Sequence, residues 1–323
     1  MTTDLVDAAR TALSVCLGLT PGERILLVSD GTALSIVEAF APAASALGLN
    51  PPAVVNIPPT GWSGREPSAD AAEAMLASDA VFVLTRDSLT HTAARRNAST
   101  RGARVASMPG LTESLFEQGM RCDYTAMREP LEAWAALLGR ARSARLVTAL
   151  GTDLSMNLEG RRGFAETGLF TSPGAVGNLP AGEAAVGPVE PASDGVLVVD
   201  GSMGGFGLLP SPLRLVVKGG RVVAAEGPFA ADLLAVGDRL GPQALSIAEL
   251  GLGANTGLEL SGSALGDEKV FGTVHVALGN SVSFGGNVDV PSHLDGIVRS
   301  PTLYLDGVRV IDRGRWLAVD PPR

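Results

Sequence analysis

The 323-residue sequence contains few of the side chains that most often carry catalytic chemistry. It has three histidines and two cysteines, and aromatic residues make up 4% of the chain. Cys16 and Cys122 show neither metal-ligand nor redox spacing, so we expect ordinary thiols in a reducing compartment. With so few reactive side chains, the positions of the histidines become the most informative feature of the sequence.

Several classes of partner and location are also disfavoured. The net charge is −9, and there is no basic run and no interleaving of basic and aromatic residues, which argues against binding to nucleic acid. No apolar run reaches membrane-spanning length. The N-terminal sequence MTTDLVDAAR lacks the basic and apolar regions of a signal peptide. We therefore expect a cytoplasmic protein with no nucleic-acid or membrane partner.

The composition of the chain suits a large hydrophobic core and many turns. Hydrophobic residues make up 46% of the chain and charged residues only 18%, so disorder is disfavoured. The sequence also contains 40 glycines and 21 prolines. This length and composition predict about two domains.

The first part of the chain alternates between apolar strand-like runs and helical patterns. We expect strands at 24–29, 53–57, 80–84 and 104–107, with helices between them. Such alternation is typical of a parallel sheet that is covered on both faces. We predict a Rossmann-like α/β domain at residues 1–142, which ends in a connector helix at 125–142.

The second part of the chain differs in pattern and composition, with shorter strand-like runs and more frequent glycine and proline. Strands are expected near 145–150, 196–200, 213–218 and 221–225, the last two joined by a hairpin turn at 218–221. Helices are expected at 230–240 and 244–250. We therefore predict that residues 143–323 form an α+β, mainly antiparallel domain.

Residues 266–296 hold two of the three histidines. Asp295 follows His293 by two positions, and residues two apart in an extended segment point to the same face. His293 and Asp295 can therefore reach one point, as two ligands reach one metal ion. A hydrogen-bonded core pair is the alternative.

Two carboxylates in the same part of the chain stand in glycine-rich or apolar surroundings. Glu183 follows a Pro-Ala-Gly turn, and Glu249 has apolar neighbours. A buried carboxylate is costly without a partner. The partner could be a metal ion or an arginine, such as Arg161 or Arg214.

Four motifs in order resemble a known family. They are NLPAGE at 178–183, AELGLG at 248–253, HVALG at 275–279 and HLD at 293–295. The series resembles the metallo-aminopeptidases of peptidase family M29 (aminopeptidase T), although the interval between the histidines is shorter. The resemblance implies a pair of divalent ions (Zn, Co, Mn or Fe) held in the C-terminal domain by five residues, which are Glu183, Glu249, His275, His293 and Asp295. It also implies a homodimer that cleaves a small peptide or amide with a metal-activated water.

One position departs from the pattern of that family. Where the family has a tyrosine that assists at the reacting carbonyl, this chain has Val282. Valine cannot donate a hydrogen bond to a developing oxyanion. The neighbouring Ser281 and Ser283 are therefore the candidates for a replacement catalytic group.

Two further functions remain open. The family has relatives that resemble 2,5-dihydroxypyridine 5,6-dioxygenase, and His275, His293 and Asp295 form the two-histidine, one-carboxylate set of non-haem iron(II) enzymes. Glu183 and Glu249 would be surplus in a site with a single iron ion. The second alternative is an inactive metal-binding relative. Glu268 could orient a ligand or carry a proton, or it could belong to a solvated turn.

Overall fold

The computed structural model describes residues 3–317, and their contacts divide the chain into two compact units. The first unit comprises Met1–Arg128 and Glu166–Ala181, and the second comprises Glu129–Ala165 and Gly182–Arg323. The predicted ranges differ from these units in two places. Residues 129–142 belong to the second unit because the connector helix passes from one unit into the other, and residues 166–181 return to the first.

The first unit is built on a five-stranded parallel sheet with the strand order β2-β1-β3-β4-β8. Its strands are β1 (Ile25–Ser29), β2 (Ala53–Asn56), β3 (Ala80–Leu84), β4 (Arg104–Ser107) and β8 (Val176–Asn178). The helices are α1 (Thr3–Thr11, continued by a π-helical turn at Ala12–Cys16), α2 (Leu34–Ala46), α3 (Ala69–Ala77), α4 (Ala93–Thr100), α5 (Glu113–Gly119) and the start of α6 (Tyr124–Arg140). The expected parallel sheet is confirmed.

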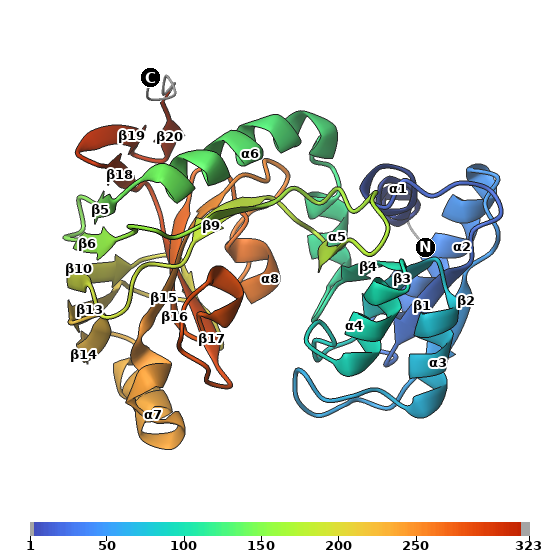
Figure 1. The fold of residues 1–323 in the computed structure, drawn as a ribbon, viewed down its shortest axis with the longest axis horizontal. Coiled ribbons are helices and arrows are strands. Elements are labelled where there is room, and N and C mark those ends of the chain that lie inside the picture. Colours follow the sequence, from blue (N-terminus) through green and yellow to red (C-terminus); the bar gives the residue numbers. More distant parts are fainter. Residues whose placement is uncertain (1–2, 318–323) are drawn as a thin grey trace. The chain divides into compact units, whose positions relative to one another are not determined.

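Both faces of this sheet are covered (Figure 1). Val81 and Val83 of β3 belong to a buried cluster that also contains Ala71 of α3 and Ala98 of α4. Phe82 points to the opposite face, where its ring lies 4.8 Å from that of Phe40 in α2. The apolar β1 and β3 are buried along their whole length, as expected for central parallel strands.

The second unit contains two antiparallel sheets. The eight-stranded sheet has the order β14-β13-β10-β6-β5-β18-β19-β20, formed by β5 (Ser143–Val147), β6 (Asp153–Asn157), β10 (Ser193–Val199), β13 (Leu213–Lys218), β14 (Arg221–Glu226), β18 (Thr302–Leu305), β19 (Val308–Asp312) and β20 (Arg315–Trp316). The seven-stranded sheet has the order β12-β11-β17-β16-β15-β9-β7, formed by β7 (Gly163–Glu166), β9 (Glu183–Val186), β11 (Ser202–Met203), β12 (Gly207–Leu208), β15 (Ile247–Gly253), β16 (Val274–Gly279) and β17 (His293–Val298). The expected mainly antiparallel character is confirmed.

Besides the larger part of α6, the helices of this unit are α7 (Ala230–Leu240) and the four-residue α8 (Ala264–Asp267), with 3-10 turns at Pro242–Leu245 and Val282–Phe284. The predicted helix at 230–240 and the hairpin that pairs Lys218 with Arg221 are confirmed. The predicted helix at 244–250 is wrong, because Ile247–Gly253 is the fully buried strand β15. Periodicity alone does not distinguish a short buried strand from a buried helix. Among the residues that the structure describes, no helix has the length and apolar character needed to cross a bilayer.

Candidate metal centre

Five acidic and histidine side chains lie on one face of the seven-stranded sheet. Glu183 starts β9, Glu249 lies on β15, His275 on β16, and His293 and Asp295 on β17. The register fixes the shared face through pairs of directly opposed residues, which are Glu183 with Gly253, Gly251 with His275, Glu249 with Ala277, Ala277 with Asp295, and Gly279 with His293. Because residues two apart share a face, the five side chains converge. The prediction that His293 and Asp295 point the same way in an extended segment is confirmed.

Small residues opposite these side chains leave the space that they occupy. A Cβ atom on Gly251 would lie 2.1 Å from Nε2 of His275. The strand positions opposite Glu249, Asp295 and His293 are also alanine or glycine. Gly251 of the AELGLG motif therefore leaves the room that the imidazole of His275 occupies.

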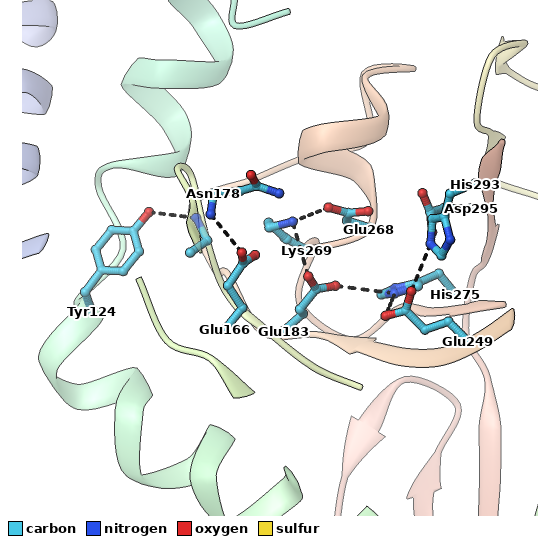
Figure 2. Close-up of polar contacts among 11 residues, drawn as sticks. Tyr124, Glu166, Asn178, Glu183, Glu249, Glu268, Lys269, His275, His293 and Asp295 are labelled. Carbon is cyan, nitrogen blue, oxygen red and sulfur yellow. Dashed lines mark hydrogen bonds and ion pairs between the residues drawn. The ribbon is translucent and has the colours of Figure 1, made fainter. Parts of the chain in front are cut away.

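The ligand atoms form two groups that share Glu249 (Figure 2). In the first group, His275 Nε2 lies 3.3 Å from Glu183 Oε2 and 3.5 Å from Glu249 Oε1. In the second, His293 Nε2 lies 3.0 Å from Glu249 Oε2 and 3.3 Å from Asp295 Oδ1. Donor atoms held about 2.0–2.2 Å from one metal ion lie at about this separation from one another.

The cluster brings three carboxylates and two imidazoles together in a largely buried site. Glu249, His275 and Asp295 are almost completely buried, whereas 29% of the His293 side chain is exposed. Burial by itself lowers the pKa of His275, but the hydrogen bond to Glu249 and the charges of Glu249, Glu183 and Asp295 raise the pKa to about 9. The pKa of Asp295 is lowered although burial opposes ionisation, because the charge of His293 and its hydrogen bond favour the carboxylate. Such a set of carboxylates and imidazoles fits a divalent cation, which would replace the protons on the histidines.

The backbone and a neighbouring aromatic ring orient His293. Its Nδ1 lies 2.8 Å from the carbonyl oxygen of Asn280, which leaves Nε2 directed at Glu249 and Asp295. The ring of Phe284 stacks on the imidazole with a centroid separation of 5.5 Å. Metal-binding histidines are commonly fixed in this way through the second ring nitrogen.

Two charged residues of the same cluster were not assigned to the site from the sequence. Lys269 is completely buried, and its Nζ lies 3.4 Å from Glu183 Oε1 and forms an ion pair with Glu268. Burial raises the pKa of Glu268 well above its usual value, although the nearby Lys269 lowers it. The Asp-Glu-Lys sequence gave no sign of burial, since it reads like an exposed turn.

The arginines considered as partners lie elsewhere. Arg161 pairs with Glu190, and Arg214 is an exposed residue of β13 in the other sheet. The positively charged side chain that contacts Glu183 is Lys269 instead.

The two candidate serines have different surroundings. Ser281 is buried, and its hydroxyl donates to Glu190 Oε1 at 2.6 Å and accepts from the Val288 amide at 3.1 Å. Ser283 is exposed, and Val282 is 52% exposed. Thus Ser281 holds the loop that follows β16, and its hydroxyl is already engaged.

Neither tyrosine belongs to the motif loop. Tyr124 is buried in the first unit, where its hydroxyl donates to the Gly119 carbonyl at 2.9 Å and accepts from the Ala181 amide at 3.3 Å. Tyr304 lies on β18 of the eight-stranded sheet. Neither tyrosine of this chain therefore lies in the loop in which the M29 family has its tyrosine.

Comparisons with known proteins show the fold and the family of the chain. The chain is similar in structure to 2,5-dihydroxypyridine dioxygenase from Pseudomonas putida KT2440, with a TM-score of 0.79 and 20% identity over 99% of each chain. It is also similar to AmpT from Thermus thermophilus, with a TM-score of 0.71 and 18% identity over 98% of this chain and 99% of the other. At these identities the likeness shows a shared fold. No curated protein sequence gives a significant match. The family model for 2,5-dihydroxypyridine 5,6-dioxygenase, NicX, matches residues 4–318, and the chain therefore belongs to the NicX family.

Proposed function

We propose that this protein is a non-haem iron(II) dioxygenase that opens the ring of a dihydroxypyridine or a similar hydroxylated nitrogen heterocycle. The family match over nearly the whole chain is the observation that carries this proposal. It favours the dioxygenase hypothesis over the aminopeptidase function that the M29 motifs suggested.

The residues that would hold the iron ion are those of the cluster on the seven-stranded sheet. His275, His293 and Asp295 would supply two imidazoles and one carboxylate, a set that leaves open positions on non-haem iron. Glu249, which belongs to both ligand groups, links the group of His275 to that of His293 and Asp295. Glu249 lies within 3.5 Å of both histidines and orients them. The ion would supply the redox chemistry by which molecular oxygen reacts with the ring.

The surroundings of His293 suit an aromatic substrate. This histidine is the most exposed of the five clustered side chains, so the site opens to solvent on its side. Phe284 stacks on it there, and aromatic rings pack favourably against one another in offset or edge-on arrangements. We propose that the substrate ring enters on this side.

A second candidate function is amide hydrolysis with two metal ions. The observation that favours it is the pair of ligand groups that share Glu249, an arrangement that suits two ions holding a common water. Against it stands Val282, which offers no donor for a developing oxyanion.

Oxygen consumption separates the two functions. Protein loaded anaerobically with Fe²⁺ is mixed with 2,5-dihydroxypyridine in an oxygen electrode, and a parallel sample with Co²⁺ or Zn²⁺ is assayed on aminoacyl amides. We expect one oxygen molecule consumed per substrate, no amide hydrolysis, and activity at background in His293→Ala. Zn²⁺-loaded protein should not consume oxygen, because zinc has no redox chemistry. Amide hydrolysis without oxygen uptake would refute the proposal.

A further inference from the structure

The loop that follows β16 makes two contacts with a side chain of the candidate metal centre. Residues 280–288, which we call the β16 loop, come directly after that strand. At the start of the loop, the carbonyl oxygen of Asn280 lies 2.8 Å from His293 Nδ1, and because a carbonyl only accepts, Nδ1 is the donor. In the middle of the loop, the ring of Phe284 stacks on the same imidazole. The conformation of the β16 loop therefore sets the orientation of His293.

A largely buried ion pair outside the β16 loop holds it at three points. Arg161 and Glu190 form this pair, and their side chains are 12% and 16% exposed. Oε1 of Glu190 accepts from the Ser281 hydroxyl at 2.6 Å and from the Asn287 amide at 3.1 Å. The guanidinium group of Arg161 donates to the Gly285 carbonyl. The pair thus binds polar groups near both ends of the loop and at the turn between them.

Two glycines allow the segment that carries Glu190 to lie directly against the loop. A Cβ atom on Gly286 would overlap the Ser281 hydroxyl and Glu190 Oε1. A Cβ atom on Gly187 would lie 2.7 Å from the carbonyl oxygen of Phe284. Since glycine has no Cβ, the two backbones can approach this closely.

The partners of Glu190 stabilise its negative charge. Burial raises the pKa of Glu190, but the hydrogen bonds from Ser281 and the Asn287 amide and the charge of Arg161 outweigh burial and lower the pKa. Hydrogen bonds to an ionised carboxylate are stronger than those between neutral groups. These contacts lead to the β16 loop and to Arg161, so the pair acts on the metal centre through the loop.

We propose that Glu190 is a positioning residue, which together with Arg161 fixes the β16 loop so that His293 Nε2 faces the ligand cluster and Phe284 stays stacked on the imidazole. The inference rests on the metal centre of the proposed function. It does not depend on the reaction that the centre carries out.

Imidazole proton NMR of the metal-free protein tests the position of His293, because the chain has only three histidines. In the wild type we expect a proton on His293 Nδ1 that the Asn280 carbonyl protects from exchange. Glu190→Gln keeps the size of the side chain but sets amide hydrogens against Arg161, so this proton should shift and exchange faster. His275 is the internal reference. Its strand β16 is paired with β15 and β17 on its two sides, so its signal should stay unchanged.

The second measurement is the affinity for Co²⁺ by isothermal titration. Partners that orient a metal ligand typically contribute about 10–100-fold in affinity, and we expect Glu190→Gln to weaken binding within that range. The matched control is Thr152→Val, which removes a buried hydroxyl that bonds both backbone groups of Val198 in the eight-stranded sheet of the same unit. It should lower the melting temperature, as Glu190→Gln does, and leave the affinity unchanged.

A double variant guards against misfolding. If Glu190→Gln does not fold, Arg161→Met/Glu190→Gln removes both charges of the pair and is measured instead, with the same expectation. An unchanged His293 signal in a folded variant would overturn the inference, and so would an equal loss of Co²⁺ affinity in Thr152→Val. Wild-type protein that binds no Co²⁺ would refute the metal centre of the proposed function, whereas the proton signal of the metal-free protein decides by itself whether Glu190 positions His293.

Discussion

Glu249 is the residue on which the other ligands of the cluster depend. It is 2% exposed, and its two oxygens face His275 and His293 separately. Burial raises its pKa, but the hydrogen bonds from the two histidines outweigh burial and lower the pKa. A buried carboxylate held between two imidazoles is stable as an anion only while positive charge remains beside it, on the histidines or on a metal ion.

This coupling predicts a pH dependence for the metal-free protein. The pKa of His275 is about 9 in the folded state and about 6.5 in an unfolded chain. The stabilisation from its protonated form is therefore complete below about pH 6.5 and is lost as the pH rises through 9. We expect the melting temperature of chelator-treated protein to fall over this range, whereas the metal-loaded protein falls less. A melting temperature that rises with pH in the metal-free protein would contradict this.

The serine beside Val282 gives a second prediction at the residue scale. Ser281→Ala removes a buried hydroxyl that bonds a carboxylate, so we expect a loss of about 1–3 kcal/mol in the free energy of unfolding. Ser283→Ala is the matched control and should change stability by less than about 0.5 kcal/mol, because Ser283 is exposed. Chemical denaturation measures both. If Ser281→Ala leaves stability intact but abolishes turnover, Ser281 has a catalytic role instead.

At the scale of secondary structure, strand β15 and its glycines decide whether the ligand side chains fit on the sheet. We expect Gly251→Ala to weaken Co²⁺ binding by about 10–100-fold or more, because the new methyl group would overlap His275 Nε2. Isothermal titration measures the affinity. Gly219→Ala is the control. It strains a hairpin glycine at φ 53° that has open space around it, so it should lower stability by about 1–3 kcal/mol without changing the affinity. Equal effects of the two variants on metal binding would contradict this account.

The same strand shows how far the sequence predicts the fold. Strands β3 and β4 are predicted to the residue, because compact apolar runs alternate with helical patterns in the first unit. Around Glu249 the apolar residues form one run without alternation, because every residue of β15 is buried, and a helix is predicted instead. The apolar pattern shows that this segment is buried. It does not show whether the segment is a helix or a strand, because the strands that pair with it are distant in sequence.

The candidate site was more predictable than the element that carries it. Scarce histidines and carboxylates in glycine-rich or apolar surroundings draw attention to these residues, and the resemblance to the M29 motifs joins the five into one predicted ligand set. Lys269 could not be found in this way, because its contact with Glu183 joins residues 86 positions apart. The engagement of Ser281 with Glu190 is likewise a contact across 91 positions.

At the scale of the whole molecule we predict a homodimer formed through the second unit. This unit carries two antiparallel sheets, and each ends in exposed strand edges unless another segment covers them. Light scattering coupled to size-exclusion chromatography at micromolar concentration should give a mass of about twice 33.0 kDa. A mass of one chain at all concentrations would refute the prediction.

The central claim is that a chain with aminopeptidase-like motifs carries out oxygen chemistry on an aromatic ring. The most direct test is isotope labelling of the product by ¹⁸O₂. Protein reconstituted with Fe²⁺ is given 2,5-dihydroxypyridine under labelled oxygen, and the product mass is determined at once by mass spectrometry. A dioxygenase predicts a ring-opened product that contains both labelled oxygen atoms. An unlabelled product, or unreacted substrate beside an active amide hydrolase, would contradict the account.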